Sequence, residues 1–131
     1  MTAACVIDAP AVLAFLFGER GGDVAGAWLD RGAAMSTANV QELASKLAEA
    51  GVERSAVEAT LADLSLEVRP ITMDLALDAG FTRADAGRRG LGHGDRACRA
   101  LARHLGLPAV TADRPWADVA PEIGVEVSLI R

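Results

Sequence analysis

The sequence predicts an α/β fold in which a short parallel central sheet is flanked by helices. Short apolar stretches typical of buried strands alternate with longer stretches whose apolar residues recur every three to four positions. Strands that alternate with helices in this way form parallel sheets joined by right-handed crossovers. The chain has 131 residues and is 51% apolar, which predicts one domain over residues 1–131 with its own hydrophobic core.

The first half of the chain begins with an apolar stretch, residues 3–7, which ends at a turn signal and predicts a buried strand. Residues 10–17 predict a helix, because proline is tolerated in a first helical turn. Residues 23–30 have helical spacing, and residues 33–36 predict a second short strand. In residues 39–50 the apolar positions recur near every 3.6 residues, which predicts a further helix.

The next elements follow the same alternation. Residues 54–64 predict a helix, and residues 66–71 an extended segment with Pro70 at its end or at a sheet edge. Residues 72–89 have a helical pattern. Residues 95–105 predict an amphipathic helix, because their apolar side chains share one face.

The chain is expected to close with a strand over residues 109–111, a short helical turn over residues 114–120 and a last strand over residues 125–129. No repeat, linker or low-complexity tract interrupts the pattern.

Four acidic residues stand at junctions of these predicted elements. Asp8 ends the first strand, Glu42 lies in the first turn of its helix, Asp95 stands at the head of another helix, and Asp113 follows the strand over residues 109–111. The carboxyl ends of parallel strands meet at one edge of the sheet, where α/β proteins bind ligands. Carboxylates gathered there repel one another unless cations neutralise them, and oxygen ligands suit Mg²⁺ or Mn²⁺.

Each acid also has a local interpretation as a capping residue. Asp8 and Asp95 have the positions of helix caps, where the helix dipole favours a carboxylate. Asn39 and Glu42 have the spacing of a capping box, and Asp113 is suited to an Asx-type turn. The two interpretations are compatible, because a helix N-terminus partly offsets repulsion between carboxylates.

The charge distribution limits the choice of partners. A net charge of −5 argues against broad nonspecific binding to nucleic acid, which usually shows a basic footprint. Six arginines nevertheless lie between residues 83 and 103. Among them, Arg96 and Arg99 are candidates for contacts to substrate phosphates. A solvated helix face is the alternative interpretation of this strip.

Cysteine usage and hydropathy point to the cytoplasm. Cys5 and Cys98 sit in apolar patterns and match no zinc or redox spacing, which favours buried free thiols in a reducing compartment. No apolar stretch approaches the ~20 residues that cross a bilayer, and the N-terminus does not read as a secretory signal. We expect a cytoplasmic protein with no membrane partner.

The four acids lie in the stretches VIDAPAVLAFL, STANVQELASKL, GLGHGDRACRALA and PAVTADRPW. In this order and at these separations the stretches resemble the signature motifs of PIN-domain ribonucleases, and most of all those of the VapC-type toxins of bacterial toxin–antitoxin pairs. The resemblance spans residues 5–116, and its most specific part is GDRAC followed by TAD.

The resemblance implies a PIN-like fold and metal-dependent cleavage of RNA, often transfer RNA, by the toxin of a type II toxin–antitoxin system. The acidic quartet of the family maps onto Asp8, Glu42, Asp95 and Asp113, which are then both catalytic residues and metal ligands. The family also implies a cognate antitoxin that inhibits the enzyme. We expect a homodimer as well, and apolar stretches such as AVLAFLF and VAGAWL are either core, a dimer face or an antitoxin contact.

Two positions depart from the family pattern. Pro10 stands two residues after Asp8, where a small hydroxyl residue is frequent, and Gly92 and His93 stand where a serine often precedes the third acid. Both changes leave every carboxylate in place, so we expect an altered rate and retained activity. His93 is either a phosphate contact or, by our preferred interpretation, an exposed loop histidine.

If the four acids converge, they fit hydrolysis of a phosphodiester by metal-activated water. Asp8 and Asp95 are the expected principal ligands of Mg²⁺ or Mn²⁺, and Asp113 completes the set or acts through a water. Glu42 either binds a second ion or takes the proton from the attacking water. Thr111 is expected to hold Asp113 or a neighbour by hydrogen bonding.

Two alternatives remain open at this stage. A PIN-like domain whose acids are only caps would be a non-catalytic protein-binding module. A nuclease acting on single-stranded DNA would use the same acids, because no residue here identifies a contact to a ribose 2′-hydroxyl.

Overall fold

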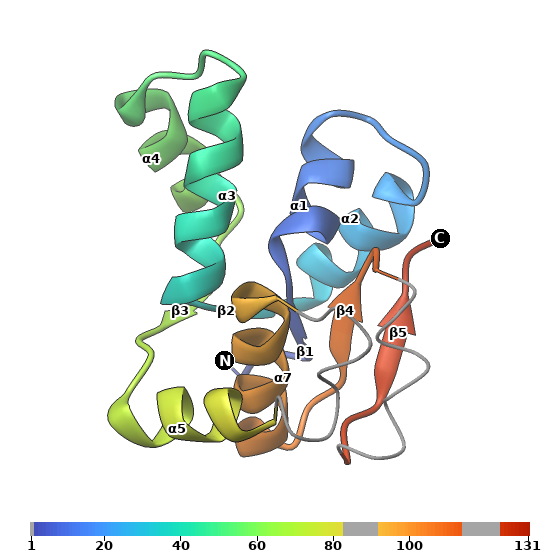
Figure 1. Cartoon of the computed structure of the whole chain (residues 1–131). Helices are drawn as coiled ribbons and strands as arrows, with labels where there is room; N and C mark the ends of the chain where they lie inside the picture. Colours follow the sequence, from blue (N-terminus) through green and yellow to red (C-terminus); the bar gives the residue numbers. More distant parts are fainter. Residues whose placement is uncertain (1, 83–91, 114–123) are drawn as a thin grey trace.

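The computed structural model describes residues 2–82, 92–113 and 124–131 (Figure 1). Within these residues five parallel strands form one sheet in the order β3-β2-β1-β4-β5. The strands are β1 (Cys5–Ile7), β2 (Ala33–Ser36), β3 (Glu67–Arg69), β4 (Ala109–Thr111) and β5 (Val127–Leu129). The predicted α/β fold with a short parallel sheet is therefore confirmed, and the edge position expected near Pro70 is that of β3.

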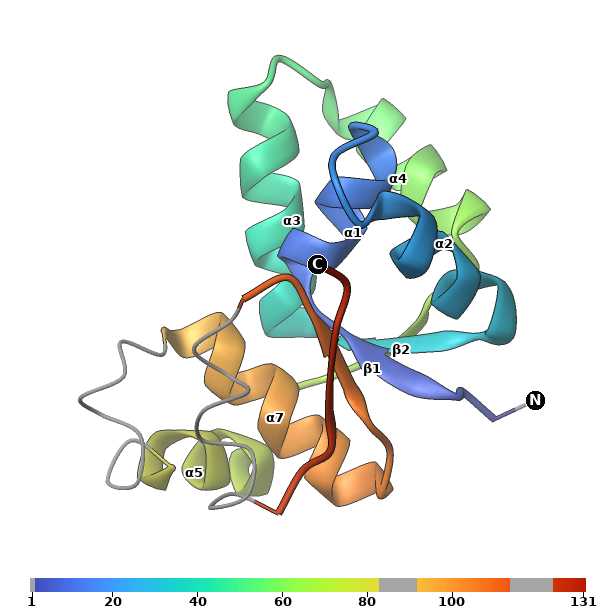
Figure 2. The ribbon, with the colours of Figure 1, turned by 90° about the vertical axis from the view of Figure 1, so that its right-hand side faces the viewer.

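Helices cover the sheet on both faces. They are α1 (Ala9–Leu16), α2 (Gly22–Arg31), α3 (Thr37–Glu49), α4 (Arg54–Asp63), α5 (Met73–Phe81) and α7 (His93–Leu105). Figure 2 shows α1 and α2 on one side of the sheet and α5 and α7 on the other. Helices α3 and α4 form a pair that projects beyond the strand ends (Figure 1).

The alternation of side chains along the strands explains these two layers. Ile7, Met35 and Val110 belong to a core with residues of α1, α2 and α3. Their neighbours Val6 and Ala34 belong to a second core with α5 and α7. Successive strand residues point to opposite faces of a sheet, so both faces of the central strands are buried, as expected of a parallel sheet.

The chain changes direction across β1. From β1 it proceeds to β2 and β3 on one side, and it later returns to β4 on the other side of β1. Such a reversal of strand order opens a crevice outside the carboxyl ends of the two strands involved. The residues that follow β1 and β4, Asp8 and Asp113, therefore lie at the place where this kind of sheet binds ligands.

Two helices, α3 and α7, begin two residues earlier than the sequence suggests. Helix α3 begins at Thr37 because the hydroxyl of Ser36 caps it and accepts the Asn39 N–H at 3.2 Å. The predicted capping box of Asn39 and Glu42 is therefore wrong, and Glu42 lies in the second turn. Helix α7 begins at His93, a residue expected to lie in a loop before the helix predicted over residues 95–105.

The C-terminal elements agree in part with the predictions. Helix α5 ends at Phe81, while residues 83–91, predicted to continue it, lie outside the described residues. The turn predicted over residues 114–120 also lies outside them. Strand β5 begins at Val127, two residues later than expected. Cys5 and Cys98 are buried and free, as predicted. Across the described ranges, every helix is too short or too polar to cross a membrane.

Candidate functional site

Asp8 is a fully buried carboxylate at the end of β1. Its Oδ1 accepts the N–H of Ala11 at 2.9 Å, so it caps α1 as the local interpretation predicts. Its Oδ2 accepts a short hydrogen bond from the hydroxyl of Thr111, at the end of β4. Asp8 is therefore both a cap and a member of the crevice between β1 and β4.

Thr111 connects the two strand ends that form the crevice. Its buried hydroxyl donates to Asp8 and accepts the backbone N–H of Asp113 at 3.0 Å. The expectation that Thr111 holds Asp113 or a neighbour is confirmed, because it holds both Asp113 and Asp8. The hydroxyl thereby fixes the chain that leaves β4 against the carboxylate that follows β1.

Glu42 and Asp95 approach this crevice from two helices. Glu42 is half-buried on α3, and its Oε1 accepts a hydrogen bond of 3.4 Å from Nδ2 of Asn39. Asp95 is half-buried in the first turn of α7, and its Oδ2 accepts the Gly92 N–H at 3.3 Å. Asp95 thus reaches back to the start of its own helix, where the helix dipole stabilises its charge.

Asp95 is the common neighbour of the other three acids. Its charge raises the pKa of Asp8, of Glu42 and of Asp113, and it also shares a side-chain hydrogen bond with Asp113. The structure therefore brings together Asp8, Glu42, Asp95 and Asp113, and we call these four residues the acid cluster. They come from four separate segments of the chain.

Burial dominates the electrostatics of the acid cluster. It raises the pKa of Asp8 from 3.8 to about 7, a rise that the hydrogen bonds from Thr111 and Ala11 only partly oppose. Burial also raises the pKa of Glu42, against the hydrogen bond from Asn39, and the pKa of Asp113. A carboxylate that is desolvated beside other carboxylates is a group that a bound cation would stabilise.

The chemistry of the acid cluster fits a hard divalent cation. All its donors are carboxylate oxygens, the ligands that Mg²⁺ and Mn²⁺ prefer. The side chains as they stand form hydrogen bonds to Thr111, Ala11 and Asn39, and Asp95 bonds to Asp113. In this arrangement no three acidic, histidine or cysteine side chains of the described ranges are grouped so that they could hold an ion. Binding an ion would therefore require some of these carboxylates to turn from their present partners.

Arg96 and Arg99, the two arginines expected to contact substrate phosphates, are buried in the protein. Their exposed fractions are 9% and 2%, so the interpretation of this part of α7 as a solvated face is wrong. Arg96 bonds through Nε to the Gly92 carbonyl at 3.4 Å. Their burial speaks against both as contacts to an RNA backbone. His93 is exposed at the first residue of α7, in agreement with the preferred interpretation apart from its helical backbone.

Asn39 is a residue of the site whose role the sequence did not indicate. It was interpreted as a cap, yet it is fully buried and contacts Glu42 and the start of α7. The spacing of Ser36 and Asn39, three residues apart, was the available signal, because a serine at a strand end is a strong N-cap and places the third residue after it inside the helix.

The arrangement of the acids at the crevice and the sequence agree on the family. The family model described as PIN domain matches residues 5–121. This chain belongs to the PIN domain family. A comparison with the sequences of curated proteins finds no match.

The PIN fold of this chain is similar to the folds of chains in several solved protein complexes. A toxin–antitoxin complex from Klebsiella pneumoniae is 17% identical, with a TM-score of 0.73 over 97% of this chain and 98% of that chain. DNA-bound VapBC from Salmonella typhimurium is 20% identical, with a TM-score of 0.66 over 99% and 100%. FitAcB from Neisseria gonorrhoeae is 18% identical, with a TM-score of 0.67 over 96% and 97%. At these identities the likeness establishes the fold of the PIN domain.

The burial of Asp8 predicts how the stability of this PIN domain depends on pH. The unfolded chain releases the Asp8 proton near pH 3.8, whereas the folded chain keeps it until about pH 7. Between these values the folded state binds more protons, so the free energy of unfolding falls as the pH rises, by a total on the order of 4 kcal/mol. Urea unfolding in EDTA at several pH values measures this slope.

The matched variants are Asp8→Asn and Asp74→Asn, the latter changing an exposed acid in the first turn of α5. Asp8→Asn should lose most of the slope and be more stable than wild type above pH 7. Asp74→Asn should keep the slope of wild type. If Asp8→Asn and wild type give parallel curves, Asp8 is already ionised in the folded chain and the assigned burial effect is wrong.

Proposed function

We propose that this PIN domain is a divalent-metal-dependent endoribonuclease of the VapC type, acting as the toxin of a type II toxin–antitoxin system. The observation that carries the proposal is the convergence on Asp95 of three acids from distant segments, at the crevice between β1 and β4. Caps alone would account for Asp8 and Asp95 but not for Glu42 and Asp113 beside them. The proposed substrate is RNA, possibly transfer RNA.

The acid cluster would hold Mg²⁺ or Mn²⁺ through its carboxylate oxygens. When bound, such an ion would offset the repulsion among the acids and supply an activated water and a stabilised leaving oxygen. Thr111 and the N-terminus of α1 hold Asp8 in place, and the first turn of α7 presents Asp95. Because Asp8 is protonated until about pH 7, its proton must leave before both its oxygens are available to a cation.

We assign Glu42 as the group that accepts the proton of the attacking water. Like Asp113, Glu42 is half-buried and has a pKa raised by burial, which improves a carboxylate as a base near neutral pH, but Asp113 is engaged in a hydrogen bond with Asp95. The water oxygen would bond to phosphorus as the bond to the 3′ oxygen breaks. The products are a 5′-phosphate and a 3′-hydroxyl, the latter having taken a proton.

Removing a carboxylate of the acid cluster should abolish cleavage. We expect Asp8→Asn and Asp95→Asn each to lower the rate of RNA cleavage by at least about 100-fold, since even groups behind the ligands of a metal cost 10–100-fold when lost. The assay uses purified protein with labelled RNA and single-stranded DNA of the same sequence, in Mg²⁺, Mn²⁺ or EDTA.

The exposed acid variant Asp74→Asn controls for the loss of one charge and should cut RNA at the wild-type rate. Cleavage of DNA alone would support the nuclease of single-stranded DNA. No cleavage of either polymer by the wild-type protein would support the non-catalytic module. Unchanged RNA cleavage by both Asp8→Asn and Asp95→Asn would defeat the assignment of the site.

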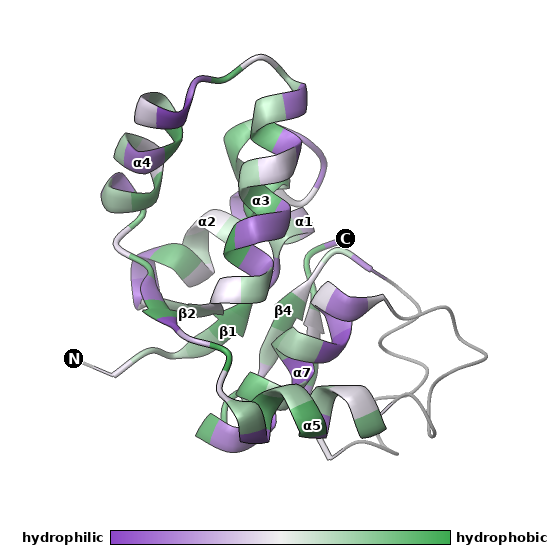
Figure 3. Cartoon of the chain, turned by 60° about the vertical axis from the view of Figure 1, so that its left-hand side comes forward, coloured by the Kyte–Doolittle hydropathy of each residue, from purple (hydrophilic) through white to green (hydrophobic). Residues whose placement is uncertain are grey.

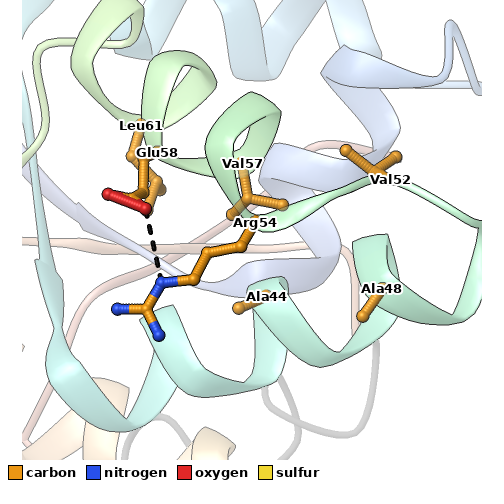
Figure 4. A pocket seen from close by; sticks show the side chains of 7 residues that line it. All are labelled: Ala44, Ala48, Val52, Arg54, Val57, Glu58 and Leu61. Carbon is orange, nitrogen blue, oxygen red and sulfur yellow. Dashed lines mark hydrogen bonds and ion pairs between the residues drawn. The ribbon is translucent and has the colours of Figure 1, made fainter.

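A cognate antitoxin is the partner we propose for the PIN domain, with support from the complexes that share its fold. Two pockets flank α4, and the first of them is apolar. One, of about 330 Å³, lies against α3 and is lined by Ala44, Ala48, Val57 and Leu61 under an exposed ion pair of Arg54 and Glu58 (Figure 4). The other, of about 400 Å³, lies against α1 and α2. The apolar pocket against α3 suits apolar side chains of a bound segment.

We further expect the antitoxin to place an arginine or lysine against the acid cluster, because a basic side chain would neutralise carboxylates that repel one another. Replacing Asp113 by Asn should weaken the complex by roughly tenfold or more, the value of a charge-assisted hydrogen bond. Titration calorimetry of the toxin with its antitoxin measures this, with Asp74→Asn as the control. A crystal structure of the complex with no basic side chain at the acid cluster would contradict the expectation.

A homodimer is the assembly we propose, and α5 offers a face for it. Met73, Leu77 and Phe81 follow one another at intervals of four residues on α5, with exposed fractions of 76%, 51% and 77%. Much of α5 is coloured as hydrophobic in Figure 3. An apolar row of this kind on a helix suits burial against a second copy of the same row.

Placing a charge in this row should dissociate the dimer. We expect Leu77→Glu to shift the molecular mass measured by sedimentation from dimer to monomer at micromolar concentration, because the carboxylate would be buried without a partner. Val24→Glu changes another half-exposed apolar residue, on α2, and should leave the mass unchanged. A wild-type monomer, or a dimer that tolerates Leu77→Glu, would exclude this face.

A further inference from the structure

Asn39 is a fully buried polar side chain that joins two helices at the acid cluster. Its Nδ2 donates to Oε1 of Glu42 on the same helix at 3.4 Å, and to the carbonyl of Gly94 on α7 at 3.0 Å. Its Oδ1 accepts the hydroxyl of Ser36 at 2.7 Å. The orientation of the amide follows from these partners, because the Gly94 carbonyl can only accept and must therefore face the nitrogen.

Gly94 permits the close approach that this bonding requires. A Cβ added at Gly94 would lie 2.6 Å from Oε1 of Glu42 and 3.3 Å from Nδ2 of Asn39. The first distance is shorter than a carbon and an oxygen tolerate, so any side chain here would push the Glu42 carboxylate away. The backbone of α7 thus lies directly against Glu42, one residue before Asp95.

The hydrogen bond from Asn39 restricts where the Glu42 carboxylate can lie. The side chain of Glu42 is long and half-buried, and the charge of Asp95 repels its carboxylate. A single amide group offers one proton to this carboxylate and the other to the α7 backbone. The position of Glu42 relative to Asp95 is therefore set by an amide that holds both helices.

We propose that Asn39 is a positioning residue that holds the Glu42 carboxylate beside Asp95 for its part in metal binding and proton transfer. This inference rests on the proposed nuclease function. Groups that orient ligands from behind typically change metal affinity or activity by 10–100-fold when they are removed. Asn39 should act through Glu42, with little direct effect on the binding of RNA.

The test is a double-mutant cycle of Asn39→Leu and Glu42→Gln. Leucine has the same branched arrangement of side-chain heavy atoms as asparagine and removes its hydrogen bonds. We expect Asn39→Leu to lower kcat for RNA cleavage by about 10–100-fold with KM changed by less than about threefold, and to raise the Mn²⁺ concentration for half-saturation by a similar factor. Mn²⁺ uptake is measured by the change in Tm and by electron paramagnetic resonance of the free ion, which do not depend on cleavage.

Coupling between the two residues separates positioning from a general loss of structure. If Asn39 acts through Glu42, adding Asn39→Leu to Glu42→Gln should change kcat and Mn²⁺ affinity by less than about twofold. Thr72→Ala removes the N-cap of α5, where Thr72 accepts the Leu75 N–H, and controls for lost stability. It should lower Tm without changing kcat or Mn²⁺ affinity.

Gly94→Ala provides a second route if Asn39→Leu does not fold. Alanine fits a helix and displaces Glu42 from the α7 side, so the same losses of kcat and Mn²⁺ affinity are expected, again absent in the Glu42→Gln background. Additive effects of Asn39→Leu or Gly94→Ala on Glu42→Gln would overturn the positioning role. A wild-type protein that neither cuts RNA nor binds Mn²⁺ would overturn the proposed function and this role with it. The coupling of Asn39 and Glu42 in Tm would then still decide whether their contact exists.

Discussion

The burial of a carboxylate where β1 meets β4 is the constraint on which the rest of the site depends. Asp8 has no access to solvent, and the fold supplies one hydrogen bond to each of its oxygens, from the start of α1 and from Thr111. Even with both bonds, burial keeps its pKa near 7. Burying a carboxyl group in this way destabilises the folded protein. Such a group is understandable at a site where we propose that it binds a cation.

The elements around Asp8 place three more acidic residues beside it, although neutral or basic residues there would stabilise the fold better. Helix α7 begins at the mouth of the crevice and presents Asp95, and β4 ends so that Asp113 follows beside it. Helix α3 contributes Glu42 from the other side. Asp8, Glu42 and Asp95 each accept a local hydrogen bond and Asp113 bonds to Asp95, but no local sequence pattern links all four acids. For Asp8 and Asp95, the role at a helix start and the proposed functional role are therefore two properties of the same residue.

The strands and the meeting of the four acids could be predicted from the sequence, because they depend on local patterns and on the order of the elements. Apolar stretches placed the strands to within two residues, and parallel strands bring their carboxyl ends together whatever their register, so the meeting of the acids followed from topology. The start of α3 did not follow, because the hydroxyl of Ser36 competes with Asn39 as the cap and lies nearer to the strand. The burial of Arg96 and Arg99 did not follow either. Helix α7 packs against the sheet on one side and against α3 and α5 on others, so residues that its apolar pattern predicts to be exposed are buried.

A crystal of the PIN domain soaked in Mn²⁺ decides whether the acid cluster binds a divalent cation, because the anomalous signal of manganese locates the ion without reference to activity. We expect a manganese peak at the crevice, bound by oxygens of Asp8 and Asp95 at about 2.0–2.2 Å, with Asp113 or Glu42 completing the set directly or through water. A crystal at saturating Mn²⁺ in which the crevice holds no ion, and Asp8 keeps both of its present hydrogen bonds, would contradict it.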